Sequence, residues 1–193
     1  MIKIKTPVSE KEIRSLQVGD TVLLSGVIVT ARDAAHKLMV EEKPDFIREF
    51  LNESMIYHCG PVVKQDNSGL WKFVSAGPTT SAREEPYQAE VIKEYNVRGV
   101  IGKGGMGPLT AQGLKDQGAV YLHAVGGAGT LIANTVKEVI NVFKLEEFGT
   151  PEAFWVIRIE ELPLVVTMDS HGGSLHKKIL EKSRNVANRL IAN

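Results

Sequence analysis

The sequence predicts an α/β fold with mixed sheets and flanking helices, and three observations support this prediction. Short apolar segments of strand type alternate with helical segments through the middle of the chain, a pattern typical of α/β folds. The strand-type segments near the two ends lack this alternation, so we expect them to pair more freely, in mixed sheets and not in a purely doubly wound sheet. No internal repeat, low-complexity tract or linker interrupts the 193 residues, which predicts a single domain over residues 1–193.

The first half of the chain contains one long apolar segment bounded by turns. Thr21–Ala31 is rich in Val, Leu and Ile and predicts a strand. Pro44 lacks the N–H that a helix interior needs, so it separates two helices, and Asp45 is expected to cap the second. The elements expected here are helices at 10–16, 34–42 and 46–52 and strands at 21–31, 55–59 and 71–76, with a surface turn at 65–69.

The second half shows helical spacing of apolar residues in two segments. In Pro86–Tyr95 the apolar residues fall on one face, and those of Leu131–Phe143 are expected to be buried in the same way. Gly118 is expected to end a helix and Ser174 to cap the last one. The elements expected here are helices at 86–95, 108–117, 131–143 and 174–191 and strands at 97–101, 119–125, 154–159 and 164–168.

The composition argues against several classes of function. The 23 basic and 23 acidic residues give a formal net charge of zero, so no general basic field attracts nucleic acid. No apolar run approaches the roughly 20 residues of a membrane span, and the first residues lack the apolar core of a signal peptide. We therefore expect a cytoplasmic protein that binds neither nucleic acid nor membrane.

The chain has one cysteine, Cys59. A single thiol cannot form an internal disulfide, and it cannot hold an iron–sulfur cluster alone, since such clusters take about three or four thiolates. The usual Cys/His spacings of zinc sites are absent too, so we expect this chain alone to bind no metal. His58 precedes Cys59, but adjacent strand residues point to opposite faces, which favours a buried thiol over a Cys–His pair.

Two glycine-containing turns each present one cation. Ser75–Arg83 carries Arg83 behind a cluster of hydroxyls, and Gly102–Met106 carries Lys103. Arginine grips a carboxylate through two parallel N–H···O bonds, lysine acts as a compact point charge, and glycine lets the backbone approach a ligand closely. This combination suits a small dianion better than a nucleotide. The second turn does not match the spacing of a phosphate-binding loop.

These features also have structural interpretations. Thr79, Thr80 and Ser81 match the start of a helix, where one hydroxyl would serve as a cap. Arg32 stands at the end of the long predicted strand, where it could meet a substrate carboxylate or pair with the aspartate that follows it. His36 lies about one turn along the next helix and can face the same crevice, although a lone histidine is more often structural.

Four motifs follow one another along the chain: Arg32–His36, His58–Pro61, Ala76–Arg83 and Gly102–Met106. Together they closely resemble the β subunit of the iron–sulfur hydro-lyases, class I fumarase and L-tartrate dehydratase, and the resemblance spans about Thr6 to Gly173. In this family the enzyme is split in two or fused into one longer chain. The resemblance implies a swivelling β/β/α domain that closes over an α subunit, which carries a [4Fe–4S] cluster on three cysteines.

The resemblance also implies a reaction and the residues for it. The reaction is the reversible addition of water across a trans double bond, with the cluster's unligated iron as a Lewis acid. Arg32, Arg83 and Lys103 match the positions that bind the substrate carboxylates. Thr79 matches the position of the base that removes the C3 proton. Thr80 stays open as the alternative base, because the register rests on the four-residue spacing from Arg83.

The remaining expectations concern neighbours, partner and substrate. His36, Thr80, Gly102 and Gly104 are expected to support the site from behind the substrate-binding residues. The implied partner is the α subunit, in a heterodimer or an α2β2 assembly, and the implied substrate is a C4 dicarboxylate. We expect fumarate hydratase, a reaction of the tricarboxylic acid cycle, because no extra polar group near the motifs asks for a second hydroxyl; L-tartrate dehydratase is the alternative. A non-catalytic small-anion-binding module and an enzyme without a cluster also remain open.

Overall fold

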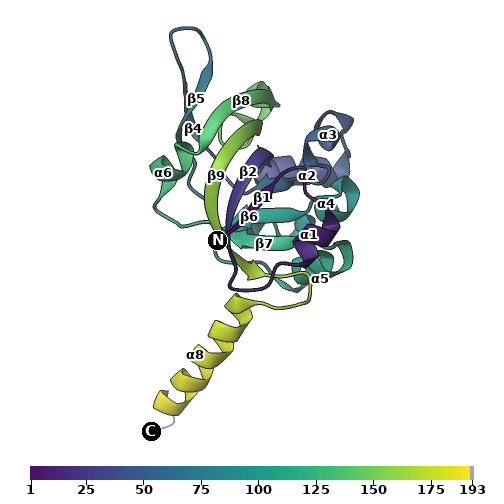
Figure 1. Ribbon diagram of the computed structural model, residues 1–193, viewed down its shortest axis with the longest axis vertical. Helices are drawn as coiled ribbons and strands as arrows, with labels where there is room; N and C mark the ends of the chain where they lie inside the picture. The colour runs from purple at the N-terminus through teal and green to yellow at the C-terminus, as the bar shows by residue number, and fades with distance from the viewer. Residues whose placement is uncertain (192–193) are drawn as a thin grey trace.

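The computed structural model describes residues 1–191, and a seven-stranded sheet with the order β1-β2-β3-β6-β7-β9-β8 forms its centre (Figure 1). The strands of this sheet are β1 (Ile2–Lys5), β2 (Thr21–Thr30), β3 (Met55–Tyr57), β6 (Gly99–Gly102), β7 (Val120–His123), β8 (Val136–Phe143) and β9 (Phe154–Met168). A separate antiparallel hairpin of β4 (Val62–Gln65) and β5 (Trp71–Ser75) projects from the sheet. The turn predicted at 65–69 joins the strands of this hairpin.

The sheet is mixed, as the sequence predicted. The pairs β1–β2, β2–β3, β3–β6 and β6–β7 are parallel, whereas β9 is antiparallel to β2, β7 and β8. Because β9 pairs with β2 along one edge and with β7 along the other, β2, β3, β6, β7 and β9 form a closed ring. The four parallel strands of the ring therefore have their carboxyl ends on the same side.

Most of the helices lie on one side of the ring (Figure 1), and most of them lie where the sequence predicted. They are α1 (Glu10–Arg14), α2 (Asp33–Glu41), the 3-10 turn η1 (Asp45–Ile47), α3 (Arg48–Leu51), the 3-10 turn η2 (Ser81–Arg83), α4 (Glu85–Tyr95), α5 (Pro108–Gln117), α6 (Gly129–Ala133), α7 (Leu145–Phe148) and α8 (Leu175–Ile191). Gly118 ends α5 at a φ of 63°, a conformation that glycine adopts without strain. At the start of α8 the Ser174 hydroxyl accepts from the Lys177 N–H at 3.3 Å.

The predicted cap at Asp45 is wrong. Pro44 occupies the capping position, with a φ of −63° that the proline ring fixes, and no side chain caps this turn. Asp45 is itself the first residue of η1, and its carboxylate accepts from the Arg48 guanidinium at 3.4 Å.

Side chains along the ring strands alternate between two apolar cores. The inner core lies within the ring and contains, among others, Ile28, Tyr57, Ile101, Leu122 and Trp155. The outer core joins the opposite faces of the same strands to α2, α4 and α5, and contains Val29, Ile56, Val100, Tyr121, Val156, Ala35, Met39, Val91, Ile92 and Leu114. Burying each large apolar side chain contributes roughly 1.5–3 kcal/mol, so both faces of these strands hold the ring in place.

The helix predicted over 131–143 is wrong. The structure has the short helix α6, which ends at Ala133, followed by the strand β8. Two bulges interrupt the pairing of β8 with β9, one between Val136 and Glu138 and one between Val139 and Asn141. Each bulge adds a residue, so Val136, Val139 and Val142 all pack against the inner core at a spacing of three. A bulged strand thus produces the apolar spacing of a helix.

The two strands predicted at 154–159 and 164–168 are one continuous strand, β9. Pro163, which suggested a break, pairs with Leu23 of β2. On its other edge β9 pairs with β8 up to Ile159 and with β7 from Val165, so within residues 1–191 no strand pairs with this edge around Pro163. A proline is tolerated where one edge of a strand forms no hydrogen bonds to a neighbouring strand. The short strands β1 and β4, both largely exposed, were not predicted.

The last helix, α8, extends away from the body of the molecule, and the C-terminus lies at its far end (Figure 1). Its described part contains no buried residue. Among residues 1–191 no helix has both the length and the apolar character needed to cross a bilayer.

Candidate functional site

The candidate site lies at the carboxyl ends of the parallel ring strands. Arg32 follows β2, His58 follows β3 and Lys103 follows β6. In open α/β sheets, ligands bind at this edge, because loops from neighbouring strands converge there while the strands hold them in place. The segment that carries Thr79 and Arg83 comes from elsewhere in the chain and is brought to the same edge.

Backbone hydrogen bonds fix this segment between the ends of β3 and β6. The Thr79 N–H donates to the His58 carbonyl at 2.7 Å, and the Ser81 N–H donates to the Lys103 carbonyl at 3.1 Å. In return the Lys103 N–H donates to the Thr79 carbonyl at 3.3 Å. The segment therefore continues the sheet for a few residues, and this pairing places Thr79 beside Lys103.

The two arginines of the site have carboxylate partners. Arg83 Nη2 pairs with Asp33 Oδ2, although the Arg83 side chain is mostly exposed. Arg32 Nη2 lies 3.3 Å from Glu152 Oε1, and the other oxygen of Glu152 accepts from the N–H of Ala34 at 3.1 Å. Glu152 thus anchors Arg32 and the first turn of α2 together.

Arg32 and Lys103 retain capacity for a ligand. Within residues 1–191, Arg32 Nε is buried without a hydrogen-bond partner, and Lys103 forms no ion pair. Gly60 lets the Arg32 guanidinium lie against the backbone, since a Cβ there would stand 2.5 Å from Nη1. The site contains three cations and the two carboxylates of Asp33 and Glu152, a local surplus of one positive charge.

The hydroxyls of the segment do not cap its helical turn. Thr80 occupies the capping position of η2 but makes no side-chain capping hydrogen bond, and it is exposed. Thr79 Oγ1 is buried and has no hydrogen-bond partner among residues 1–191. A buried polar atom without a partner is uncommon in a native fold and is one mark of a functional position. This observation separates Thr79 from Thr80.

Behind the segment lies a buried polar network centred on Ser81. The Ser81 hydroxyl is 2.8 Å from His58 Nδ1 and accepts from the Tyr121 hydroxyl at 2.8 Å. The Gln88 amide reaches His58 Nε2 at 2.7 Å and His36 Nε2 at 2.9 Å. All five side chains are completely buried, so the network is a rigid support for the backbone of the site.

Both histidines of the network are neutral. Burial lowers the pKa of His36 and, more strongly, that of His58. His36 Nδ1 faces the Arg32 carbonyl at 2.9 Å and must carry the proton, so its Nε2 is an acceptor. Each of the two Nε2 atoms then needs a hydrogen-bond donor. The Gln88 amide supplies it to both when the amide is rotated by a half-turn, so that its nitrogen faces the two rings.

Two further groups have pKa values displaced by burial. Burial first, and then the neighbouring Asp33, raises the pKa of Glu84 to about 8. Burial raises the pKa of the Cys59 thiol to about 12. A thiol held so firmly protonated does not serve as a metal ligand, and residues 1–191 contain no group of three or more His, Cys, Asp or Glu arranged to hold a metal ion. The described residues therefore do not fit an iron–sulfur cluster.

The structure brings most of the predicted residues together, but it places them in different surroundings. Thr79, Thr80, Arg83 and Lys103 lie on adjoining turns, and Arg83 meets the start of α2 through Asp33. His36 is completely buried and reaches the site only through Gln88.

The two predicted glycines have different environments. Gly102 fits against the network, whereas Gly104 is exposed in an open turn with a φ of 86°.

The sequence analysis missed four residues of the site: Glu84, Gln88, Tyr121 and Glu152. It considered Asp33 only as a partner of Arg32, whereas Asp33 pairs with Arg83 and Arg32 pairs with Glu152. A signal for two of them exists in the spacing of Ser81, Glu84 and Gln88, which are three and four residues apart and so share one face of a helical segment. Because all three residues on this face are polar, the spacing of apolar residues does not show that the face points inward.

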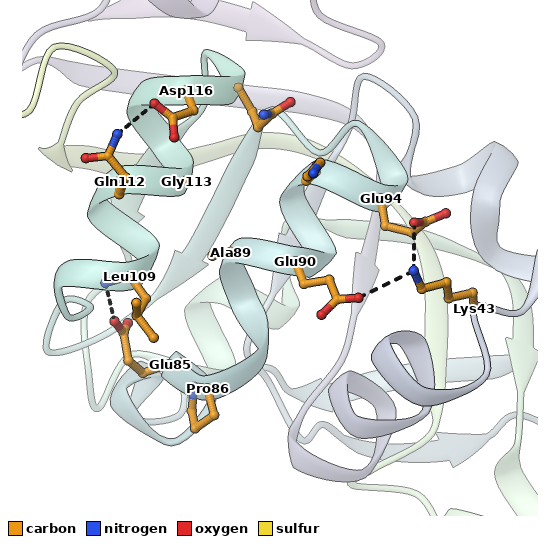
Figure 2. A pocket seen from close by; sticks show the side chains of 12 residues that line it. Lys43, Glu85, Pro86, Ala89, Glu90, Glu94, Leu109, Gln112, Gly113 and Asp116 are labelled. Carbon is orange, nitrogen blue, oxygen red and sulfur yellow. Dashed lines mark hydrogen bonds and ion pairs between the residues drawn. The ribbon is translucent and has the colours of Figure 1, made fainter.

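A shallow groove between α4 and α5 lies apart from these residues (Figure 2). Most of its charged groups already have partners. Lys43 bridges Glu90 at 3.4 Å and Glu94 at 3.3 Å, and Glu85 accepts from the Leu109 N–H at 2.9 Å. The groove contains none of the cations of the candidate site, and we assign it no ligand.

Comparisons with known proteins were made with the whole chain. The family model described as Fumarase C-terminus matches residues 1–179. A relative from Geobacillus stearothermophilus that bears the name of a class I fumarate hydratase is 49% identical over 183 residues, which are 95% of this chain and 35% of that protein. The chain thus spans about a third of that longer relative.

Two other relatives match nearly end to end. A protein from Methanocaldococcus jannaschii named as an L(+)-tartrate dehydratase subunit beta is 45% identical over 95% of each chain. The L(+)-tartrate dehydratase subunit beta of Escherichia coli strain K12 is 38% identical over 94% of this chain and 91% of its own. The chain therefore resembles about a third of a longer protein and nearly the whole of shorter ones.

The network predicts that Gly102 does not tolerate a side chain. A Cβ at this position would lie 1.9 Å from Ser81 Oγ, 3.1 Å from the Tyr121 hydroxyl and 3.3 Å from His58 Nδ1. We expect Gly102→Ala to lower the free energy of unfolding by about 1–3 kcal/mol, as overpacking does in a closed core. Urea denaturation of the chain measures this.

Gly126→Ala is the matched control, since a Cβ there meets nothing closer than Lys103 Cδ at 3.7 Å. We expect this change to stay within about 0.5 kcal/mol of the unsubstituted chain. Equal unfolding midpoints for the two variants would show that the network can move aside and is not rigid.

Proposed function

The chain belongs to the Fumarase C-terminus family, and from this premise we propose that it is the β subunit of an iron–sulfur hydro-lyase acting on a C4 dicarboxylate. The observation that carries the proposal is the convergence of Arg32, Arg83 and Lys103 at one edge of the ring, beside a buried hydroxyl without a partner. A dicarboxylate in a closed site needs compensating charge, because its desolvation is otherwise prohibitive.

The cations have distinct roles in this proposal. Arg32, with its free Nε and its anchor on Glu152, offers a preorganised grip for one carboxylate. Arg83 is more exposed and binds the other carboxylate when the site is covered by a partner. Lys103 supplies a point charge next to Thr79, where negative charge develops on the substrate as the C3 proton leaves.

Thr79 is the proposed base for the C3 proton. A threonine hydroxyl is a poor base unless a neighbour lowers its pKa, and in this proposal that neighbour is Lys103, whose backbone pairs with that of Thr79, or a group that the substrate or the partner brings. Thr80 is exposed on the same turn and is the alternative.

The [4Fe–4S] cluster implied by the family belongs, in this proposal, to an α subunit, since residues 1–191 do not fit it. The cluster would supply Lewis-acid chemistry in the assembled enzyme.

The proposal includes the assembly. The chain, as one swivelling domain over residues 1–193 in the cytoplasm, closes over the α subunit in a heterodimer or an α2β2 complex. Closure excludes water and strengthens the contacts of the cations with the substrate. The substrate and the partner would then be bound together, and each would raise the affinity for the other.

Fumarate is the proposed substrate and L-tartrate the alternative. These substrates differ in hydroxylation, and a pocket built to bind an extra hydroxyl discriminates strongly against an analogue that lacks it. The names of the relatives support both, one as a fumarate hydratase and two as tartrate dehydratase β subunits. The motifs show no additional polar group for a second hydroxyl, which favours fumarate.

Co-expression with the α subunit and anaerobic reconstitution of the cluster test the proposal. We expect hydration of fumarate by the complex and none by the chain alone. Calorimetric titration with an unreactive C4 dianion such as succinate should give far tighter binding to the complex than to the chain. Equal affinities would favour the small-anion-binding module, and turnover by the chain alone would favour an enzyme without a cluster.

Arg83→Lys should damage the assembled enzyme although the charge is kept. Lysine cannot make the two parallel hydrogen bonds of a guanidinium to a carboxylate. We expect kcat/KM to fall by the equivalent of about 2–4 kcal/mol, measured by steady-state kinetics of the complex. Arg158→Lys, at an exposed pair with Glu138, is the control and should be near neutral. Unchanged kinetics of Arg83→Lys would remove Arg83 from the site.

Thr79→Ala should lower kcat by about 100-fold or more and leave KM and cluster content nearly unchanged, as loss of a general base does. Thr79→Ser should keep more activity, because the hydroxyl remains. A large kcat defect in Thr80→Ala instead would move the base by one residue. If neither variant shows the defect, the base lies outside this segment.

A further inference from the structure

One buried acid has no part in the chemistry proposed above. Glu84 stands between η2 and α4 and is completely buried. Neither of its carboxyl oxygens has a hydrogen-bond partner among residues 1–191 when both are treated as acceptors. Asp33 Oδ1 is buried and unpartnered in the same way, while Asp33 Oδ2 pairs with Arg83.

The buried, unpartnered carboxyl oxygens of Glu84 and Asp33 belong to neighbouring groups, and each group displaces the pKa of the other. If both were ionised, two negative charges would repel in a buried place, and three oxygens would lack a donor. One proton shared between them removes the repulsion and supplies the missing donor. The proton belongs on Glu84, because Asp33 faces Arg83 and the more buried acid is the one that neutralises.

We propose that Glu84 is a positioning residue that stays protonated at neutral pH, and that its O–H donates to Asp33 Oδ1 and so keeps Asp33 Oδ2 directed at Arg83. The proposal deepens the proposed function, since Arg83 is the arginine assigned there to a substrate carboxylate. Glu84 does not touch the substrate; it acts through Asp33.

The charged and titratable groups around Glu84 agree with this assignment. On α2, Asp33 favours the protonated form of Glu84, while the backbone N–H of Glu84 itself and the Arg83 guanidinium on η2 oppose it less strongly. Behind it, His58 Nδ1 lies 3.9 Å from Glu84 Oε2, but burial keeps the ring neutral. On β7, burial raises the pKa of Tyr121 to about 12, so that side chain is neutral as well.

Protonation of Glu84 also sets the charge of the site. With Glu84 neutral, the three cations exceed the carboxylates of Asp33 and Glu152 by one. Ionisation of Glu84 cancels this surplus and pushes Asp33 away from its place beside Arg83. Both effects weaken binding of a dianion, so affinity should fall as the pH rises through about 8.

Infrared difference spectroscopy of the chain tests the protonation state directly. The spectrum of the unsubstituted chain minus that of Glu84→Gln at pH 7 should contain the carbonyl band of a protonated carboxyl, and this band should titrate away around pH 8. In Asp33→Asn the midpoint of the titration should move to lower pH, because the neighbouring negative charge is gone. Glu90→Gln, at an exposed position on α4, the helix that follows Glu84 (Figure 2), should leave the band unchanged.

The free energy of unfolding of the chain should also depend on whether Glu84 is protonated. Glu84 releases its proton near pH 4.5 when unfolded and near pH 8 when folded. The stability contributed by the protonated form is therefore fully present below pH 4.5 and is lost as the pH rises to about 8. Glu84→Gln should lack this fall, whereas Glu90→Gln should retain it.

Kinetics of the assembled complex test the positioning role. The KM for the dicarboxylate should rise by about fivefold between pH 8 and 9 in the unsubstituted enzyme, as for loss of one required proton with a pKa of about 8, with little change in kcat. This rise should be absent in Glu84→Gln, which keeps a neutral donor. Glu84→Ala, which has no donor, should have a higher KM than Glu84→Gln already at pH 7.

The outcomes separate the two proposals. Absence of the protonated-carboxyl band at pH 7 overturns the assignment of Glu84, whether or not the complex is a hydro-lyase. Presence of the band with the same pH profile of KM in Glu84→Gln and the unsubstituted enzyme overturns the positioning role alone. A complex without hydro-lyase activity overturns the proposed function, while the band still decides the state of Glu84.

Discussion

The insertion of the Thr79–Ser81 backbone between the ends of β3 and β6 is the constraint on which the site depends. Parallel strands leave their last carbonyl and N–H groups without partners once they diverge. Here the segment satisfies the His58 and Lys103 carbonyls, and it carries a hydroxyl into the space that Gly102 leaves open. Backbone pairing, and not side-chain contact, therefore sets the relation between Thr79 and Lys103.

Carboxylates that hold the cations in place also reduce the positive charge available to an anion, and the structure limits this loss. Carboxylates hold Arg32 and Arg83 in place, yet each also neutralises part of the charge available to an anion. The arrangement is favourable because the partners use only part of each guanidinium fork. Partial pairing fixes the position of the side chain, and the free N–H groups keep the capacity to bind.

Much of the fold could be predicted from the sequence, because local signals and tertiary structure agree in most elements. The strand β2 is apolar along its length, and Gly118 marks the end of α5. The failure at β8 has a physical cause, since two bulges gave the strand a spacing of three. Arg83 and Lys103 could be found because they stand on glycine-containing turns, and Arg32 because it stands at the end of a strand. Glu84 could not, because its burial depends on α2, which is distant in sequence.

The single cysteine can report how often the ring of strands opens, because its thiol is buried while the ring is closed. Cys59 lies in the inner core with no exposed surface, one residue before the glycine on which the Arg32 guanidinium rests. A thiol-specific label can react there only when the strand ends separate and the thiol ionises. The rate of labelling under native conditions would thus give the frequency with which the ring opens beside its cations. The native thiol serves as the probe. An anion bound at this edge that holds the strand ends together would slow the labelling reaction.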